Sequence, residues 1–414
     1  MKEGTDLLSN LFRQEFSKMV AVISKTFGLP QLELAEDIVS ETFLQATESW
    51  GQKGIPANPT AWLYVVARQR TLHLFRRNKI LDKKIIPELK ATQKSTEEIG
   101  EIDFSADNIK DSQLQMMFAI CNPAIASEAQ IALALRILCG FGIDEIAEAF
   151  LSNKDTINKR LFRAKEKLRT EKVSLEMPSE QEIGQRLDNV LHIIYLLFNE
   201  GYYSTTQNQL LQKDLCLEAL RLGILLTEFS GTSQPRTYAL LALMCFHASR
   251  FDARQNGNRA FVLYEQQDES LWDRELIEQG HAFLALSAQG NEISSYHLEA
   301  GIAFWHCRKE DTEEKWENIL HHYDLLLQIN YSPMVALNRT YALYKARGRA
   351  EAIAEAEKLQ LTGNHFYFIL LGELYTGIDP QKARLHLQTA FSLAKTQTEK
   401  RSIREKIDGL SGEG

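Results

Sequence analysis

The sequence contains few cysteines and prolines and no long apolar segment. Its 5 cysteines are scattered without a Cys-x-x-Cys pair, which argues against a disulfide framework and against a thiolate metal site. No run of about 18 apolar residues occurs, so no membrane-spanning helix is expected. Residues 1–10 carry acidic side chains and lack the apolar core of a signal peptide. We therefore expect a cytoplasmic protein that uses no metal and does not enter a membrane.

The length and composition are those of a globular protein with several domains. The 414 residues exceed what one helical core organises, and 44% of them are hydrophobic while 25% are charged. The net charge of −8 is unevenly spread, because residues 1–178 hold 24 basic and 24 acidic side chains. The whole acidic excess therefore lies in residues 179–414, and we expect the two parts to face different partners.

The apolar pattern predicts an all-α fold. Apolar residues recur at intervals of three and four, and no hairpin turn separates alternating segments. We expect helical domains at residues 7–80 and 113–172, a polar linker at 81–112, and a helical extension at 184–400. Within the extension, two segments are similar to the helix pairs of tetratricopeptide repeats. They are Ala336–Leu359, with Gly348 at its turn, and Phe368–Ala394, with Gly377 at its turn.

An acidic helix is predicted from Ala35 to Ala46. Ile38, Phe43 and Ala46 can face a core, whereas Asp37 and Glu41 lie four residues apart and share an outward face. Such a face is either a solvated acidic surface or a contact for a basic partner.

A basic helix is predicted to begin at Asn58-Pro59, where an N-cap precedes a proline. Its expected apolar stripe consists of Ala61, Tyr64, Val65, Leu72 and Phe75. On the other side, Trp62 lies among basic side chains, namely Arg70, His73, Arg76 and Arg77. An aromatic ring among arginines suits stacking with unpaired bases, while the cations hold phosphates. The alternative is a solvated basic helix in which Trp62 belongs partly to the core.

The second domain is predicted to contain a helix-turn-helix. A helix at Glu128–Leu138 ends at Gly140, a short helix follows at Ile143–Phe150, and Ser152–Asp155 fits the cap of a third. The third helix would bury Ile157, Leu161, Ala164 and Leu168, and it would present Thr156, Lys159, Arg160, Arg163 and Lys167. A short helix, a turn and a longer basic helix is the order of a DNA-binding motif. Phe150-Leu151 stands where many such turns use glycine.

Together, these segments resemble the extracytoplasmic-function sigma factors of bacterial RNA polymerase. The resemblance rests on Ala35–Phe43, on Trp62 to Arg77, and on Glu145–Ala147 with Thr156 and Arg163–Lys165, in this order and separation. The rest of the chain is similar to the long helical extension of one subgroup. The similar segments are Tyr195–Tyr202, Leu241–Met244, Asp268–Trp272 and Ser332–Arg339.

The resemblance implies an alternative sigma factor, which binds core RNA polymerase and directs it to promoters. It implies that the polymerase clamp is contacted by Asp37, Glu41 and Ile38. It implies that the minus-ten element is bound by Trp62, Arg70, His73, Arg76 and Arg77. It implies that the minus-thirty-five element is bound by Thr156, Lys159, Arg160 and Arg163. Gln69 and His73 stand where many members have Asn and Asp, a departure that affects the minus-ten sequence and not phosphate binding.

Two other functions stay open at this point. A regulator could use the helix-turn-helix without joining polymerase, and an enzyme could occupy the extension. The extension shows no nucleophile–base pair, phosphate loop or metal spacing, so we expect no catalysis and no cofactor. We expect it instead to mask or to assist the sigma domains, or to dock a protein regulator. Residues 1–174 are expected to suffice for polymerase binding.

Overall fold

The computed structural model describes residues 2–85, 102–202, 209–254, 262 and 264–410. These residues form helices and no strands, which confirms the expected all-α fold. The chain divides into two compact units, Met1–Thr237 and Tyr238–Gly414. The extension was expected to begin at residue 184, whereas the boundary between the two units lies after Thr237. The boundary therefore falls inside the segment assigned to the extension.

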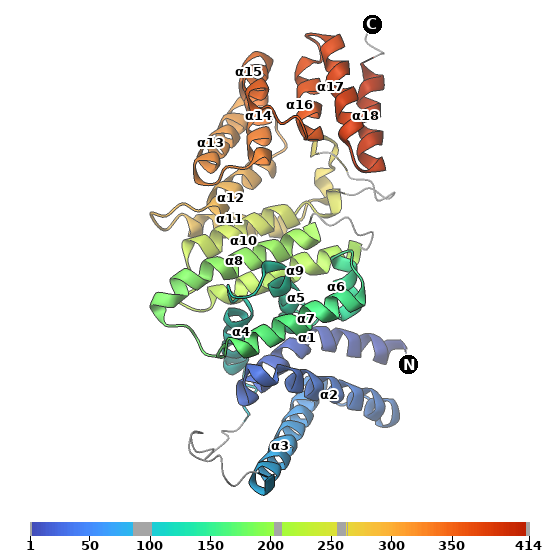
Figure 1. The fold of residues 1–414 in the computed structure, drawn as a ribbon, viewed down its shortest axis with the longest axis vertical. Coiled ribbons are helices and arrows are strands. Elements are labelled where there is room, and N and C mark those ends of the chain that lie inside the picture. Colours follow the sequence, from blue (N-terminus) through green and yellow to red (C-terminus); the bar gives the residue numbers. More distant parts are fainter. Residues whose placement is uncertain (1, 86–101, 203–208, 255–261, 263, 411–414) are drawn as a thin grey trace. The chain divides into compact units, whose positions relative to one another are not determined.

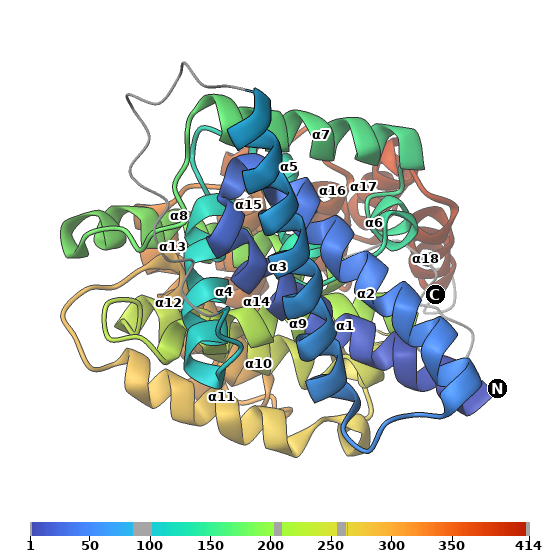
Figure 2. The same ribbon diagram turned by 90° about the horizontal axis from the view of Figure 1, so that it is seen from below.

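The N-terminal unit begins with three long helices, α1 (Lys2–Phe27), α2 (Leu32–Lys53) and α3 (Pro59–Ile85). Figure 2 shows α2 and α3 joined by a short loop. One face of α1 is completely buried and consists of Phe16, Met19, Val20 and Ile23. Their spacing of three and four residues places them on a single helix face, which forms the centre of this part of the core.

The C-terminal end of the expected linker is part of the folded unit. Helix α4 (Ala106–Ile120) begins inside the range assigned to the linker, and the Ser105 side chain caps it by accepting a hydrogen bond from the Asn108 amide. Ile102 and Ile109 pack against Val22 of α1. The linker assignment is therefore wrong from Ile102 onward, because an apolar pair in this polar segment reaches the core. Residues 86–101 of the assigned linker lie outside the described residues.

Four short elements follow, namely α5 (Ser127–Leu133), the π-helical η2 (Ala134–Leu138), α6 (Ile143–Ala149) and α7 (Lys154–Thr170). Gly140 ends η2 with a φ of +72°, a conformation that favours glycine. The side chains expected to be buried on the third helix, Ile157, Leu161, Ala164 and Leu168, are all buried. The predicted stripe of α7 is therefore confirmed.

Helices α8 (Glu180–Tyr202) and α9 (Gln209–Thr227) complete the N-terminal unit. They pack side by side (Figure 1), and the inner face of α8 buries Leu187, Val190, Leu191, Leu197 and Phe198. The Arg186 guanidinium donates to the carbonyl oxygen of Phe118 at 2.6 Å, and Arg221 donates to that of Leu138 at 2.6 Å. These bonds satisfy carbonyls at the ends of α4 and η2, which have no partner within their own helices.

The C-terminal unit consists of paired helices. The boundary between the units falls near the start of α10 (Pro235–Ala248), so most of α10 belongs to the C-terminal unit. It is followed by α11 (Arg274–Ser287), α12 (Ser295–His306) and α13 (Glu313–Ile329). The remaining helices are α14 (Pro333–Arg347), α15 (Arg349–Leu359), α16 (His365–Tyr375), α17 (Pro380–Leu393) and α18 (Gln397–Gly409). In Figure 1, α16, α17 and α18 lie side by side.

The two segments predicted to be helix pairs are α14 with α15 and α16 with α17. Gly348 and Gly377 lie at their turns with φ of +93° and +80°. Ala352 and Ala383, early in each second helix, are 0% exposed. The small side chains let the paired helices approach closely.

Candidate nucleic-acid interface

The basic helix α7 is positioned by its cap and by the turn before it. The Asn153 side chain accepts a hydrogen bond of 2.8 Å from the Thr156 amide, which satisfies an amide at the helix start. Leu151 has a φ of +47°, so the turn adopts the left-handed conformation with a leucine instead of a glycine. This conformation costs about 1–2 kcal/mol for a residue with a Cβ atom, and the side chain of Leu151 points outward at 67% exposure.

The outward face of α7 forms one wall of a groove of about 540 Å³. The α7 residues of this wall are Thr156, Lys159, Arg160, Arg163 and Lys167. The opposite wall, at the start of α5, is mostly apolar and includes Ile125, Ala126 and Ala129. The structure therefore brings the predicted minus-thirty-five residues together on one surface.

The cations of this groove differ in what they contact. Arg160 pairs with Glu128 at 3.1 Å, and its guanidinium lies over the Phe150 ring at 5.1 Å. Lys167 pairs with Glu171 at 2.6 Å. Lys159 and Arg163 are exposed, and neither forms an ion pair with another described residue. These two side chains are therefore the ones most available to phosphates.

Helix α8 contributes a carboxylate to the same region. Burial and the neighbouring Glu128 carboxylate raise the pKa of Glu200, and Arg160 opposes this rise. Arg160 thus faces two acidic residues, one from α5 and one from α8. Its role in the structure is to tie these elements to α7.

The acidic face of α2 is exposed as predicted. Asp37 and Glu41 both point to solvent, and partial burial followed by the neighbouring carboxylates of its own helix raises the pKa of Asp37. Leu44 continues this face and is 60% exposed. The sequence analysis did not single out Leu44, although its spacing of three from Glu41 and seven from Asp37 places it there.

Ile38 does not belong to this face. It is 1% exposed and lies in the core beneath α2. Ile38 is therefore not part of the exposed acidic face, because successive residues of an α-helix point about 100° apart, and its contact with polymerase stays a prediction.

The basic helix α3 buries a different stripe from the one predicted. Val65 is 53% exposed, whereas Leu63 and Ala67 are 0% exposed, and Ala61 is exposed as well. Trp62 is half-buried and meets Trp50 edge to face with ring centroids 5.4 Å apart. The structure thus supports the alternative in which Trp62 belongs partly to the core.

The residues of α3 that were predicted to bind the minus-ten element differ in their contacts. Arg70 forms an ion pair with Glu41 and donates to the Gln45 side chain at 2.9 Å, so it links the acidic face of α2 to α3. His73 and Arg76 are exposed. The side chain of Arg77 lies outside the described residues.

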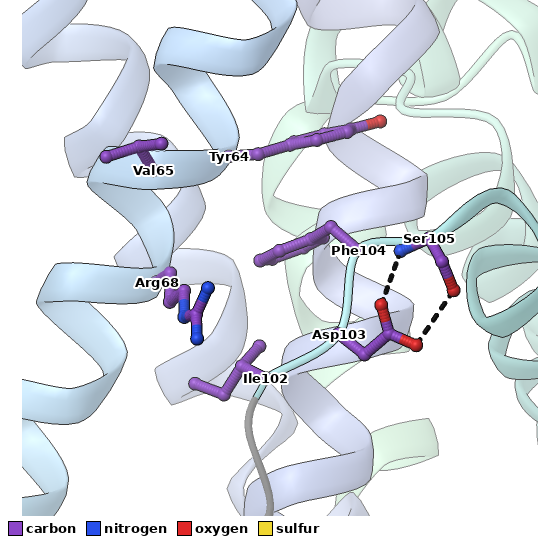
Figure 3. A pocket seen from close by; sticks show the side chains of 7 residues that line it. All are labelled: Tyr64, Val65, Arg68, Ile102, Asp103, Phe104 and Ser105. Carbon is purple, nitrogen blue, oxygen red and sulfur yellow. Dashed lines mark hydrogen bonds between the residues drawn. The ribbon is translucent and has the colours of Figure 1, made fainter.

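The opposite side of α3 forms a pocket of about 620 Å³ with the segment before α4 (Figure 3). The Tyr64 and Phe104 rings stack in it with centroids 4.8 Å apart and an interplanar angle of 11°. Asp103 accepts hydrogen bonds from the Ser105 amide at 2.7 Å and hydroxyl at 2.8 Å, and these bonds lower its pKa. The contacts anchor the end of the segment that joins α3 to α4.

A buried ion cluster joins α2 to α7. Glu36 of α2 is 6% exposed, and its carboxylate accepts hydrogen bonds from Arg136 Nε at 3.0 Å and from Lys165 Nζ at 2.6 Å. Arg13 of α1 pairs with both Glu145 of α6 and Asp214 of α9. Ion pairs therefore link α2 to α7, and a second group of ion pairs links α1 to α6 and α9.

No described helix is both long and apolar enough to cross a lipid bilayer. No group of three or more His, Cys, Asp or Glu side chains in the described ranges could hold a metal ion. All five cysteines are buried, and none forms a disulfide bond.

Comparisons with known proteins match two parts of the chain to family models and the chain as a whole to a relative. Residues 11–80 match the Sigma-70 region 2 family, a range that covers α2 and most of α1 and α3. Residues 186–288 match a family of unknown function, DUF6596. An uncharacterized protein of Rhizobium meliloti (strain 1021) is 34% identical over 387 residues, which cover 92% of this chain and 91% of the relative.

Proposed function

Because the chain belongs to the same family as this Rhizobium meliloti protein and carries a Sigma-70 region 2, we propose that it is an alternative sigma factor of bacterial RNA polymerase. In this proposal it binds core polymerase, directs it to promoters and catalyses no reaction. The observation that carries the proposal is the match of residues 11–80 to Sigma-70 region 2, on helices that expose an acidic face and a basic face.

The proposal assigns the two faces to two partners. Asp37, Glu41 and Leu44 on α2 contact the polymerase clamp, since a basic partner surface is complementary to two exposed carboxylates. His73 and Arg76 on α3 contact the minus-ten DNA. Trp62 stacks on an unpaired base only if it leaves Trp50, so its contribution comes with a local rearrangement.

The groove on α7 is the proposed contact for the minus-thirty-five element. Helices α6 and α7 follow the order of a helix-turn-helix, and Thr156, Lys159 and Arg163 face outward near the start of α7. Side chains at the beginning of such a helix reach base edges in the major groove. The capped start of α7 and its two unpaired cations support this assignment.

The C-terminal helices are proposed to form a tetratricopeptide-like extension of an extracytoplasmic-function sigma factor. Their paired arrangement with glycine turns supports a repeat surface that docks a protein regulator. Helices α8 and α9 are different, because they complete the N-terminal unit and bond to the ends of α4 and η2. Regulation by the extension would therefore act through a segment that is built into the sigma domains.

The experiment that tests the proposal is in vitro transcription with core polymerase over genomic fragments, combined with co-purification. The Asp37→Lys/Glu41→Lys variant should lose polymerase binding. Since it also breaks the Glu41–Arg70 pair, Arg70→Ala serves as a control that breaks the pair without altering α2. Glu351→Lys/Glu405→Lys reverses two exposed charges of the other unit and should bind normally.

A promoter-binding regulator that never joins polymerase is the competing function. It predicts promoter binding by the free chain, no co-purification with core polymerase and no promoter-specific transcript. That combination would replace the sigma-factor proposal.

A further inference from the structure

An aromatic and cationic cluster occupies the interior of the C-terminal unit. At its centre lies Tyr264, in the short helix η4 (Tyr264–Gln266). The Trp272 ring stacks on it with centroids 6.4 Å apart, and the His306 ring meets it edge to face at 5.1 Å. Lys315 Nζ and the Arg250 guanidinium lie 4.9 Å and 5.4 Å from the centroid of the same ring. Four side chains from different parts of the unit thus converge on one tyrosine.

Two cations of the cluster are buried. Arg250 is 7% exposed and Lys315 is 1% exposed, and neither forms an ion pair with any residue whose position is described. Lys315 Nζ donates to the Tyr264 hydroxyl at 2.9 Å and to the carbonyl oxygen of Arg308. Burial lowers the pKa of Lys315 to about 8, the Asp311 carboxylate opposes this shift, and Arg250 reinforces it. Burying a charge outside an ion pair is costly, so Arg250 in particular attracts a negative group.

Four buried polar atoms around the same ring have no hydrogen-bond partner. Three are nitrogens, namely Arg250 Nε, Trp272 Nε1 and His306 Nδ1, and the fourth is the acceptor Gln267 Oε1. The Gln267 amide is oriented by its Nε2, which donates to the carbonyl oxygen of Val262 at 3.3 Å. Buried polar atoms are normally bonded, and here the unbonded ones gather at one place.

We propose that this cluster is a binding site for a phosphate group carrying one proton, either as free hydrogen phosphate or as part of a small phosphate-bearing ligand. The anionic oxygens would accept from Arg250 Nε and Trp272 Nε1 and from Lys315, and the P–O–H would donate to Gln267 Oε1. A carboxylate has no such donor, and sulfate carries no proton near neutral pH. The chemistry of the four atoms thus selects hydrogen phosphate.

His306 fits this assignment as a neutral donor. Burial and the nearby cations Arg250 and Lys315 lower its pKa to about 3, so the ring carries one N–H at neutral pH. The tautomer with a proton on Nδ1 donates a hydrogen bond without adding a charge. Both charged and neutral donors then surround the phosphate oxygens, which is typical of phosphate recognition.

The test is isothermal titration calorimetry of the full-length protein with inorganic phosphate at pH 7, in a buffer held at constant ionic strength with chloride. We expect one phosphate per chain with a Kd below about 1 mM, and at least tenfold weaker binding of sulfate and acetate. Equal binding of sulfate or acetate, or no phosphate binding, would overturn the proposal. The measurement uses neither polymerase nor DNA, so its failure leaves the sigma-factor proposal unaffected.

Substitutions test whether phosphate binds at the cluster around Tyr264. Arg250→Gln should weaken binding at least about tenfold, since it removes a charged donor. Arg308→Gln is the matched control, because that guanidinium lies over the Phe304 and Trp305 rings and not at the cluster. Lys159→Ala/Arg163→Ala removes the DNA-facing cations and should bind phosphate normally.

If Arg250→Gln fails to fold by circular dichroism, Trp272→Phe tests the same site. It keeps an aromatic ring while removing the unpaired N–H, and it should weaken phosphate binding severalfold. Unchanged affinity in a folded cluster variant, or loss of affinity in Lys159→Ala/Arg163→Ala, would place the phosphate elsewhere.

Discussion

The two units of the chain treat their buried cations differently. In the N-terminal unit, Arg136 and Lys165 meet at the carboxylate of Glu36. In the C-terminal unit, Arg250 and Lys315 lie against the ring of Tyr264, and no carboxylate of the described part pairs with them. A tyrosine ring attracts a cation, but far less strongly than a carboxylate in the same surroundings.

This difference shows that the net charge of a region of the sequence does not predict whether its buried cations form ion pairs. The neutral part of the sequence builds a charge cluster that is complete, because acidic and basic residues from α2, η2 and α7 meet there. The acidic part buries Arg250 and Lys315, which form no ion pair with a described residue. The first arrangement holds helices together, whereas in our proposal the second holds a ligand.

The largest expected effect concerns the extent of the N-terminal unit. A chain ending after Ser174 lacks α8 and α9, whereas a chain ending after Thr237 retains them. Helix α8 alone buries Leu187, Leu191 and Leu197 completely, and each such side chain contributes about 1.5–3 kcal/mol. We expect the longer chain to unfold cooperatively in urea and the shorter one to aggregate or to lose its cooperative transition.

Polymerase binding sharpens the same point. The sequence analysis expected residues 1–174 to suffice, whereas the packing of α8 and α9 in the N-terminal unit leads us to expect that stable binding needs residues 1–237. Equal stability and equal polymerase affinity of the two truncated chains would show that α8 and α9 are dispensable for the N-terminal unit.

The next effect tests the complete charge cluster. Replacing Glu36 by Gln leaves Arg136 and Lys165 without a counterion, and breaking a buried pair in this way costs about 3–5 kcal/mol. Urea denaturation of the full chain should show this loss in the transition of the N-terminal unit. Glu33→Gln is the control, because Glu33 is exposed and lies 4.0 Å from Lys165. A loss below about 1 kcal/mol in Glu36→Gln would mean that the cluster does not hold α2 to α7.

The comparison also separates what the sequence could predict from what it could not. The buried stripe of α7 was predictable, because Ile157, Leu161 and Ala164 recur at helical spacing and their partner is simply the nearest core. On α2, helical spacing places Glu36 beside the buried residues Val39 and Phe43, whereas Asp37 falls on the exposed face with Glu41. The spacing does not reveal that Arg136 and Lys165 are the partners of the buried carboxylate, because they come from distant parts of the sequence.

Packing between distant segments also explains the error on α3 and the fact that the cluster around Tyr264 was not predicted. The helical period allows two neighbouring stripes on α3, and packing on Trp50 and α1 selects the one that leaves Val65 exposed. The cluster around Tyr264 joins segments separated by more than 60 residues, from Arg250 to Lys315. No motif spacing in the sequence indicates such a site.

A smaller effect follows from the pKa of His306. Burial lowers this pKa to about 3 in the folded protein, whereas an unfolded chain has the ordinary value of about 6.5. Between these values the unfolded state binds more protons, so the stability of the C-terminal unit falls as the pH drops below about 6.5. The slope reaches at most about 1.4 kcal/mol per pH unit from this group.

Urea denaturation of the C-terminal transition from pH 7 to pH 5, in phosphate-free buffer, measures this slope. His306→Asn should flatten it, whereas His321→Asn, at an exposed position, should leave it unchanged. An identical slope in wild type and His306→Asn would mean that His306 is not held neutral by burial.

The smallest expected effect concerns promoter affinity and depends on which cations on the surface of α7 form ion pairs. Lys159 and Arg163 are exposed and form no ion pair with the described residues, so each is free to replace a counterion on DNA. Replacing either by Ala should lower promoter affinity severalfold and reduce the slope of log K against log salt by about one. Arg160 is held by Glu128 and Phe150, so Arg160→Ala should change the salt slope less and the stability of the N-terminal unit more. Fluorescence anisotropy with a labelled promoter duplex at several salt concentrations, alongside urea denaturation, separates the two outcomes. If Arg160→Ala lowers the salt slope as much as Lys159→Ala does, then Arg160 leaves Glu128 when DNA binds, and pairing in the free protein does not decide which cations reach the phosphates.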